Sequence, residues 1–373
     1  MRGPIVQIIP RRGLQPIVNT APALGALAGR LASSARVALD TEFLRERTYR
    51  AQLCLLQIAT ADEAVCIDPL SLVTLGPLAD VLAAGGVTKV MHASRQDLEV
   101  LLPLAGLTRP VFDTQIAASL IGLPAQVGYA EAVRRLLGIE LAKSHTRTDW
   151  SRRPLSAEQI EYALDDVRYL LPLAVELQER LERLGRLQWL AEELHALDDA
   201  RALTIDPGEA WQRLRGLRDL DPARGRLARA LAAWRERTAI EHNRPRGWIL
   251  EDSVLREIVM QVPRTLERLA QLPDMPGGLV KRRGAELLAC VAAAEIPDPP
   301  PPLPARPRPD VARAALVRKL GAISQAVAEE LGLVPEVLAT RRDLEQLAEG
   351  RRDGPLSRGW RLEVLGQRLL AAL

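Results

Sequence analysis

The chain contains few cysteines and no long apolar run, and each shortage excludes a class of protein. Its 373 residues include only three cysteines, an odd number without a Cys-x-x-Cys pair, so a disulfide framework or a cysteine zinc site is not expected. No uninterrupted apolar stretch is long enough to cross a bilayer. Prolines and arginines interrupt the first 13 residues, which does not fit a secretory signal. We therefore expect no membrane association and interpret Cys54, Cys66 and Cys290 as reduced core residues.

Lysine is also scarce, and the charge is unevenly distributed. Of the 50 basic residues, 46 are arginine, which is typical of a protein from a GC-rich genome. Residues 1–207 have a net charge of −3 (22 basic, 25 acidic), residues 208–292 of +5 (16 and 11) and residues 293–373 of +1 (12 and 11). An acidic region suits a site that holds cations, and a basic neighbour could hold a polyanion. Ordinary variation explains the +5 equally well.

The apolar periodicity predicts an α/β region followed by an all-helical one. Helical periods alternate with short β-branched or alternating segments, which gives a mixed sheet. Ser156, followed by Gln159, has the spacing of a capping box at the start of a long helix. The predicted strands are 37–43, 53–59, 64–68, 89–92 and 111–114. The predicted helices are 72–84, 96–104, 115–121, 129–137 and 156–184.

Four acids in short, distinctive contexts are the candidate catalytic residues. Asp40 and Glu42 end an apolar strand and, being two apart, leave the same face of it. Asp97 lies in the first turn of a predicted helix after a short strand. Asp166 follows Tyr162 by four residues, on one helical face. An acid of this kind taken alone would be interpreted as a solvated surface residue.

Hydrolysis of a phosphodiester explains why so many acids would be needed. In-line attack develops negative charge on the attacking and the leaving oxygen, and two divalent cations roughly 4 Å apart stabilise both. Mg²⁺ and Mn²⁺ prefer oxygen ligands. Clustered carboxylates repel one another without such cations, so the pattern predicts either bound metal or raised pKa values.

The ordered set of motifs resembles the ribonuclease D family of the DEDD superfamily of 3′-to-5′ exonucleases. The resemblance implies a ribonuclease H-like α/β domain in which the four acids bind two ions of Mg or Mn. It also implies that Tyr162 holds the attacking water; the alternative branch of the superfamily has histidine where this chain has Glu161. The motifs are Asp40-Thr41-Glu42-Phe43, Leu53 to Ile58, His92 to Asp97, Asp113-Thr114-Gln115 and Tyr162 to Asp166.

The helical tail resembles the helicase-and-ribonuclease-D C-terminal (HRDC) domain. The residues that support this resemblance include Trp234, Asn243-Arg244-Pro245, Trp248 and Asp252, with both tryptophans expected in the core. A second, divergent HRDC-like domain is expected at the end of the chain. Its near-neutral charge argues against direct RNA binding, so its expected role is either packing on the exonuclease domain or shaping a ring-like entrance. The predicted domains are 1–207 (exonuclease), 208–293 (first HRDC), 294–309 (proline-rich, extended linker) and 310–373 (second HRDC-like).

Six residues are predicted to contact substrate on weaker grounds. Phe43 could stack on the terminal base or pack in the core, and His92 could instead hydrogen-bond within the fold. Arg152 belongs to a polar loop before Ser156 that needs no such role. The full set is Thr41, Phe43, His92, Arg152, Arg244 and Lys281.

The resemblance predicts a hydrolytic 3′-to-5′ exoribonuclease that releases nucleoside 5′-monophosphates from tRNA precursors and other small structured RNAs. A monomer in the bacterial cytoplasm, with no obligate protein partner, is the expected setting. A DNA exonuclease is an alternative, because the motifs do not read the 2′-hydroxyl. An inactive RNA-binding adaptor is another, but it would have lost at least one acid, and all four are present.

Overall fold

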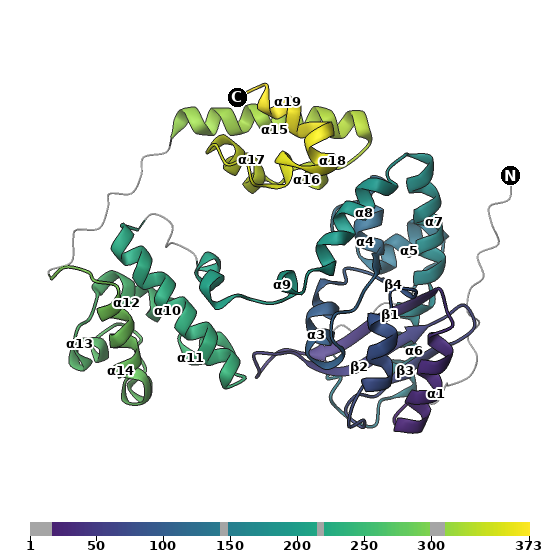
Figure 1. The fold of residues 1–373 in the computed structure, drawn as a ribbon, viewed down its shortest axis with the longest axis horizontal. Helices are drawn as coiled ribbons and strands as arrows, with labels where there is room; N and C mark the ends of the chain where they lie inside the picture. The colour runs from purple at the N-terminus through teal and green to yellow at the C-terminus, as the bar shows by residue number, and fades with distance from the viewer. Residues whose placement is uncertain (1–16, 142–147, 215–219, 299–309) are drawn as a thin grey trace. The chain divides into compact units, whose positions relative to one another are not determined.

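The computed structural model describes residues 17–141, 148–214, 220–298 and 310–373 (Figure 1). The chain divides into two compact units. The first contains residues up to Leu44, Gln52–Leu203 and Val311–Leu373, and the second contains Arg45–Ala51 and Thr204–Asp310. Much of the predicted linker lies outside the described residues. No helix in the described ranges is long and apolar enough to cross a membrane.

A five-stranded mixed sheet forms the centre of the first unit, and all five predicted strands are confirmed. The order is β3-β2-β1-β4-β5, so the strand that carries Asp40 and Glu42 is central. β1 is antiparallel to β2 and parallel to β4. The strands are β1 (Arg36–Leu44), β2 (Gln52–Ala59), β3 (Ala64–Ile67), β4 (Thr88–Met91) and β5 (Val111–Asp113).

Helices cover both faces of this sheet, and β2 and β3 are buried along most or all of their length. Four predicted helices are confirmed with small changes at their ends, whereas α1, α8 and α9 were not predicted. The helices are α1 (Ala21–Leu31), α2 (Gly76–Ala83), α3 (Arg95–Ala105), α4 (Thr114–Leu120), α5 (Tyr129–Leu137), α6 (Ala157–Arg168), α7 (Leu170–Arg183), α8 (Leu187–His195) and α9 (Ala200–Leu203).

The single long helix predicted over 156–184 is wrong, because the chain forms two helices that meet at Tyr169. Pro172 has no N–H, and in a continuous helix its ring would clash with the carbonyl four residues earlier. The N–H of Tyr169 instead donates to the hydroxyl of Tyr129, at 3.2 Å. That hydroxyl in turn donates to the carbonyl of Asp165, at 3.1 Å. The junction is thus held by a residue of α5.

The C-terminal helices belong to the same unit as the sheet and share one apolar core with it. The rings of Trp189 on α8 and Trp360 on α18 stack with centroids 4.5 Å apart. The indole N–H of Trp360 donates to Glu193 at 2.8 Å. Packing on the exonuclease domain, one of the two expected roles of this segment, is therefore confirmed. These helices are α15 (Val311–Leu331), α16 (Pro335–Leu338), α17 (Arg341–Ala348), α18 (Gly359–Arg361) and α19 (Gln367–Leu370).

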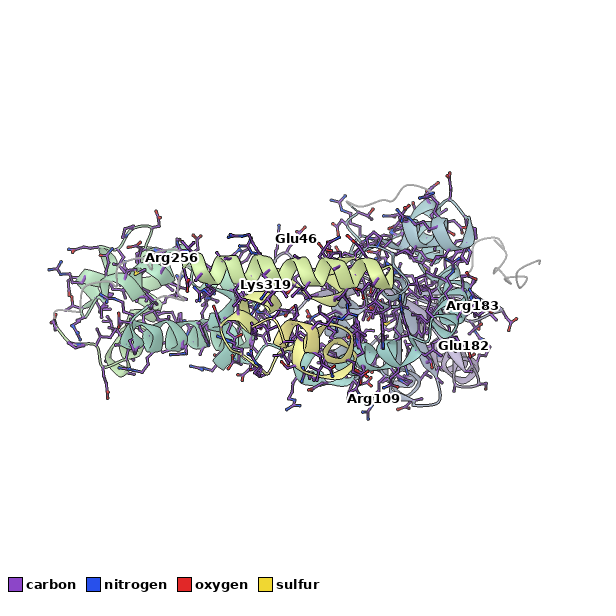
Figure 2. All side chains as sticks on the ribbon, turned by 90° about the horizontal axis from the view of Figure 1, so that it is seen from above. Glu46, Arg109, Glu182, Arg183, Arg256 and Lys319 are labelled. Atoms are coloured by element: carbon purple, nitrogen blue, oxygen red, sulfur yellow. The ribbon has the colours of Figure 1, made fainter. Side chains whose placement is uncertain are left out.

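The second unit is helical and has its own apolar core. Trp234 is buried as predicted, but the prediction that Trp248 is buried is wrong: Trp248 is 60% exposed, because it lies on the outer side of a helix of only four residues. The main helices are α10 (Pro222–Glu241), α11 (Arg246–Ile249), α12 (Asp252–Gln261), α13 (Leu266–Ala270) and α14 (Gly277–Ala293). Exposed charged side chains, such as Arg183, Arg256 and Lys319, lie at the surface of both units (Figure 2).

Candidate active site

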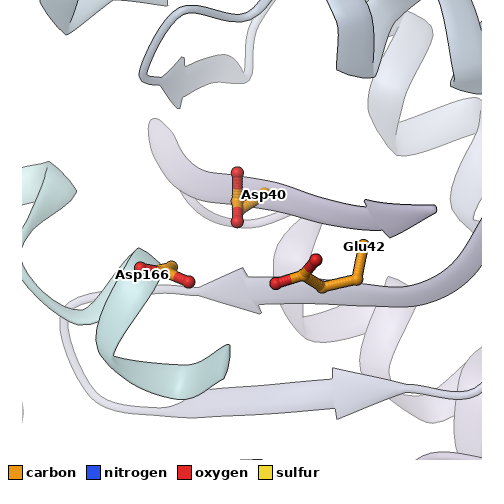
Figure 3. A group of neighbouring side chains, drawn as sticks. All are labelled: Asp40, Glu42 and Asp166. Carbon is orange, nitrogen blue, oxygen red and sulfur yellow. The ribbon is translucent and has the colours of Figure 1, made fainter. Parts of the chain in front are cut away.

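Three of the four predicted acids meet between strand β1 and helix α6. Asp40 and Glu42 leave one face of β1, and Asp166 reaches them from α6, with the three side chains turned toward one another (Figure 3). One carboxylate oxygen of each residue lies within 4.8 Å of the others. All three side chains are half-buried, so the cluster is open to solvent on one side.

The electrostatics of this cluster favour a bound cation. Burial, followed by repulsion from neighbouring carboxylates, raises the pKa of Glu42 to about 8 and the pKa of Asp40 well above its usual range. Burial is also the main cause that raises the pKa of Asp166 to about 7. The metal-free cluster therefore holds protons near neutral pH, and a divalent cation would allow all three groups to ionise.

The fourth acid, Asp97, lies beside the cluster at the start of α3. Burial raises its pKa to about 6, and its charge is the strongest neighbouring influence on the pKa of Asp40. The hydroxyl of Thr41 donates a hydrogen bond to the Asp97 carboxylate, and both side chains are buried. The Thr41 side chain is thus used by the fold to hold Asp97, and its predicted contact with substrate stays a prediction.

Tyr162 lies one helical turn before Asp166, and its hydroxyl donates to the Asp166 carboxylate. Burial and the charge of Asp166 raise the pKa of the phenol, so it stays protonated at neutral pH. The predicted capping box that begins α6 is present: Ser156 accepts from the N–H of Gln159, and its own N–H donates to Gln159. This cap fixes the first turn of the helix that carries Tyr162 and Asp166.

The donor set fits Mg²⁺ or Mn²⁺. Every candidate ligand is a carboxylate, and these ions prefer oxygen ligands, whereas zinc sites usually contain histidine or cysteine. Gln57 on β2 is directly across from Asp40, so the two side chains share a face of the sheet. Gln57 is fully buried, and neither atom of its side-chain amide has a hydrogen-bond partner among the described residues. A polar amide is therefore available beside the acids.

Of the other predicted contacts in this unit, His92 is used by the fold. Its Nδ1 lies 2.8 Å from the Thr114 hydroxyl, and its Nε2 lies 2.9 Å from the Val127 carbonyl. Both ring nitrogens therefore have partners in the fold, and the contact of His92 with substrate stays a prediction. Phe43 is half-buried, next to a bulge that follows Glu42, and its substrate contact stays a prediction.

The remaining predicted contacts are exposed and basic. Arg152 forms an ion pair with Asp149 at 3.2 Å on the surface. In the second unit, the Arg244 guanidinium lies 5.8 Å from the ring centre of Trp248, and Lys281 is exposed near the start of α14. Their contact with substrate stays a prediction.

One aromatic neighbour of the site was missed from the sequence. Trp150 is 5% exposed, and its ring stacks on Tyr162 with centroids 6.1 Å apart and an interplanar angle of 26°. A tryptophan in a segment otherwise rich in charge, in a chain with only six tryptophans, is the signal that could have identified it.

Comparisons with known proteins identify the family to which the chain belongs. The sequence matches a family described as 3′-5′ exonuclease over residues 16–182 and the HRDC domain over residues 224–291. It is 41% identical to the ribonuclease D of Granulibacter bethesdensis, covering 95% of this chain and 91% of the relative. It is also 41% identical to the ribonuclease D of Gluconacetobacter diazotrophicus, covering 95% of this chain and 92% of the relative. The chain belongs to the ribonuclease D family.

Structural comparison supports the same assignment. The crystal structure of Escherichia coli RNase D matches with a TM-score of 0.85 and 31% identity, covering 97% of this chain and 99% of that one. The crystal structure of the catalytic core of RRP6 from Trypanosoma brucei matches with a TM-score of 0.55 and 25% identity, covering 77% of this chain and 82% of that one. The chain is accordingly a hydrolytic 3′-to-5′ exoribonuclease with one recognised HRDC domain.

Proposed function

We propose that this protein removes nucleoside 5′-monophosphates, by two-metal hydrolysis, from the 3′ ends of small structured RNAs, including tRNA precursors. The observation that carries the proposal is the trio of carboxylates within 4.8 Å, with the Tyr162 hydroxyl on Asp166. Its Escherichia coli relative is described as an exoribonuclease involved in structured RNA processing, which supports this class of substrate.

The four acids would hold the metal ions, and each has a distinct place in the fold. Two ions of Mg²⁺ or Mn²⁺, when bound, would supply positive charge for the attacking and leaving oxygens. Asp40 and Glu42 would bind from β1, Asp166 from α6 and Asp97 from α3. The Thr41 hydroxyl would keep the Asp97 side chain oriented toward the cluster.

Tyr162 would orient the attacking water. Its phenol is protonated, because burial and the charge of Asp166 raise its pKa, so it cannot act as a general base at neutral pH. A protonated hydroxyl can still hydrogen-bond to the water. Precise placement of a nucleophile can account for roughly 100-fold in rate.

The second unit would hold the body of the RNA. Arg244 and Lys281 are exposed and would contact phosphates, which make up most of the affinity for a polyanion. Trp248 is exposed beside Arg244 and could stack on an unpaired base. Because all the acids come from one chain, a monomer is the proposed working form, and the bacterial cytoplasm, where tRNA precursors are made, is its proposed setting.

A denaturing-gel time course tests the function. A 5′-labelled tRNA precursor with a 3′ extension and a matched single-stranded DNA would be incubated with Mg²⁺, Mn²⁺ or EDTA. We expect stepwise shortening of the RNA in either metal and none in EDTA, with nucleoside 5′-monophosphates as the product. Equal trimming of the DNA would instead support the broader exonuclease.

Asp166→Asn and Asp80→Asn form a matched pair of control variants. Both lose one negative charge, but Asp80 is exposed on α2, away from the cluster. We expect Asp166→Asn to be inactive while still binding RNA, and Asp80→Asn to retain full activity. An active Asp166→Asn enzyme would contradict the proposed site.

A further inference from the structure

Trp150 covers one face of the Tyr162 ring. The two rings are stacked with centroids 6.1 Å apart, and Trp150 is almost fully buried. Stacked aromatic pairs of this geometry attract one another beyond the burial of their surfaces. The position of a tyrosine hydroxyl oxygen is set by the χ1 torsion, because χ2 only turns the ring about the axis on which the oxygen lies. A flat ring stacked on the face of Tyr162 restricts the swing of its side chain about χ1, and so restricts where the hydroxyl can lie. The hydroxyl at the far end of that ring donates to Asp166.

The segment that carries Trp150 is fixed to the sheet by Arg153. The guanidinium of Arg153 donates to both carboxylate oxygens of Asp68, which follows β3, at 2.8 and 2.7 Å. It also donates to the carbonyl of Cys54 on β2 and to the carbonyl of Trp150, each at 2.7 Å. Asp68 is nearly buried and additionally accepts from the Ser71 hydroxyl at 2.8 Å.

We propose that Trp150 is a positioning residue for Tyr162, anchored to β2 and β3 through Arg153. The inference rests on the proposed function of Tyr162. The sheet and helix α6 would then be connected in two ways at the site. One connection would be the metal ions that the acids hold, and the other runs through Asp68, Arg153 and Trp150. The second connection sets the direction of the phenol independently of the metal ligands. Loss of Trp150 lets the ring move, so the rate of hydrolysis falls while substrate binding is kept.

A double-mutant cycle tests this role with the full-length protein. Trp150→Leu, Tyr162→Phe and the double variant would be compared in single-turnover hydrolysis of a short unstructured RNA, in saturating Mg²⁺. We expect Trp150→Leu to lower the hydrolysis rate by roughly 10-fold, with little change in the RNA concentration for half-maximal rate. In the Tyr162→Phe background the same substitution should change the rate by less than about twofold, because the effect passes through the hydroxyl.

The outcomes separate the two claims. If Trp150→Leu lowers the rate equally in both backgrounds, the positioning role is wrong and Tyr162 can still be catalytic. If Tyr162→Phe hydrolyses RNA at the wild-type rate, the catalytic role of Tyr162 is wrong, and the positioning role with it. Trp150→Phe keeps an aromatic ring beside Tyr162, so this variant should retain most of the wild-type rate of hydrolysis.

Two further variants distinguish a loss of positioning from a loss of folding. Trp360→Leu makes the same change at a buried residue of the same core that stacks on Trp189 instead of Tyr162. We expect it to lower thermal stability without lowering the hydrolysis rate. If Trp150→Leu does not fold, Arg153→Lys replaces it in the cycle, because it loosens the anchor without emptying space in the core. A rate loss for Arg153→Lys that persists in the Tyr162→Phe background would overturn the proposal.

Discussion

The hydroxyl of Tyr162 donates a hydrogen bond to the carboxylate of Asp166, one turn further along the same helix. This hydrogen bond lowers the pKa of Asp166, although burial and the charge of Asp165 outweigh that effect. Because this effect is outweighed, the proposed task of the hydroxyl is to orient the attacking water and not to keep Asp166 ionised. The rest of the proposed chemistry depends on this arrangement.

Replacing Tyr162 with Phe removes only the hydroxyl and keeps the ring against Trp150. We expect kcat to fall by roughly 100-fold, because the attacking water loses its orientation. KM and the affinity for Mn²⁺ should change little, since the four acids remain. Steady-state kinetics and calorimetric titration with Mn²⁺ measure both quantities. A parallel loss of metal affinity would indicate that the hydroxyl acts on the ligand set instead.

The raised pKa values predict how pH affects the metal-free protein. Glu42, with a pKa of about 8, and Asp166, with about 7, hold protons in the folded state that they lose when the chain unfolds. The folded state therefore binds more protons than the unfolded state between about pH 4 and 8, so the free energy of unfolding falls as pH rises through this window.

Thermal melts at several pH values measure this effect. In EDTA we expect this cluster to lower the melting temperature as pH rises from 6 to 8, and Mg²⁺ to offset the loss. Glu42→Gln is the control, because an amide cannot ionise and should reduce the slope. An identical pH dependence for Glu42→Gln and wild type would contradict the raised pKa of Glu42.

The contact between Trp360 and Trp189 couples the C-terminal helices to the rest of the first unit, so we expect it to contribute to the free energy of unfolding of that unit. Trp360→Ala removes the stack and leaves a cavity, which should cost about 3–5 kcal/mol. For a unit of this size that corresponds to a melting temperature lower by roughly 10 °C. Trp248→Ala is the matched control, because that indole is 60% exposed. Equal melting temperatures for the two variants would contradict the shared core.

We predict that the second unit contacts RNA at Trp248 and Arg244. Trp248→Ala should weaken binding by about 1–3 kcal/mol, the usual contribution of one base stacked on an aromatic ring. The rate at saturating RNA should not change, because the residue belongs to the other unit. Fluorescence anisotropy with labelled RNA in EDTA measures the affinity. Arg256→Ala serves as the control, because it removes another exposed side chain of the same unit, on α12.

The central sheet and the acids could be predicted from the sequence because their signals are local. Asp40 and Glu42 stand two residues apart in an extended strand, directly after its apolar run, and this spacing fixes the face that the acids share. The spacing of Tyr162 and Asp166 likewise places them on one helical face. These patterns depend on neighbouring residues only, and all five strands were found.

Features that depend on distant residues were missed. The break at Tyr169 is held by Tyr129, 40 residues earlier, and no periodicity within the helix reveals that partner. The role of Thr41 depends on Asp97, 56 residues away. Trp248 was misplaced because an apolar side chain on a short helix can face either the core or solvent, and only the packing of the unit decides.

The number of metal ions bound per chain tests the central claim most directly. Mn²⁺ would be titrated into the wild-type protein with a bound nucleoside 5′-monophosphate, and the free ion followed by electron paramagnetic resonance. We predict two ions per chain for the wild type and fewer for Asp40→Asn. Only one ion for the wild type, or an unchanged number in the variant, would contradict two-metal hydrolysis at this cluster.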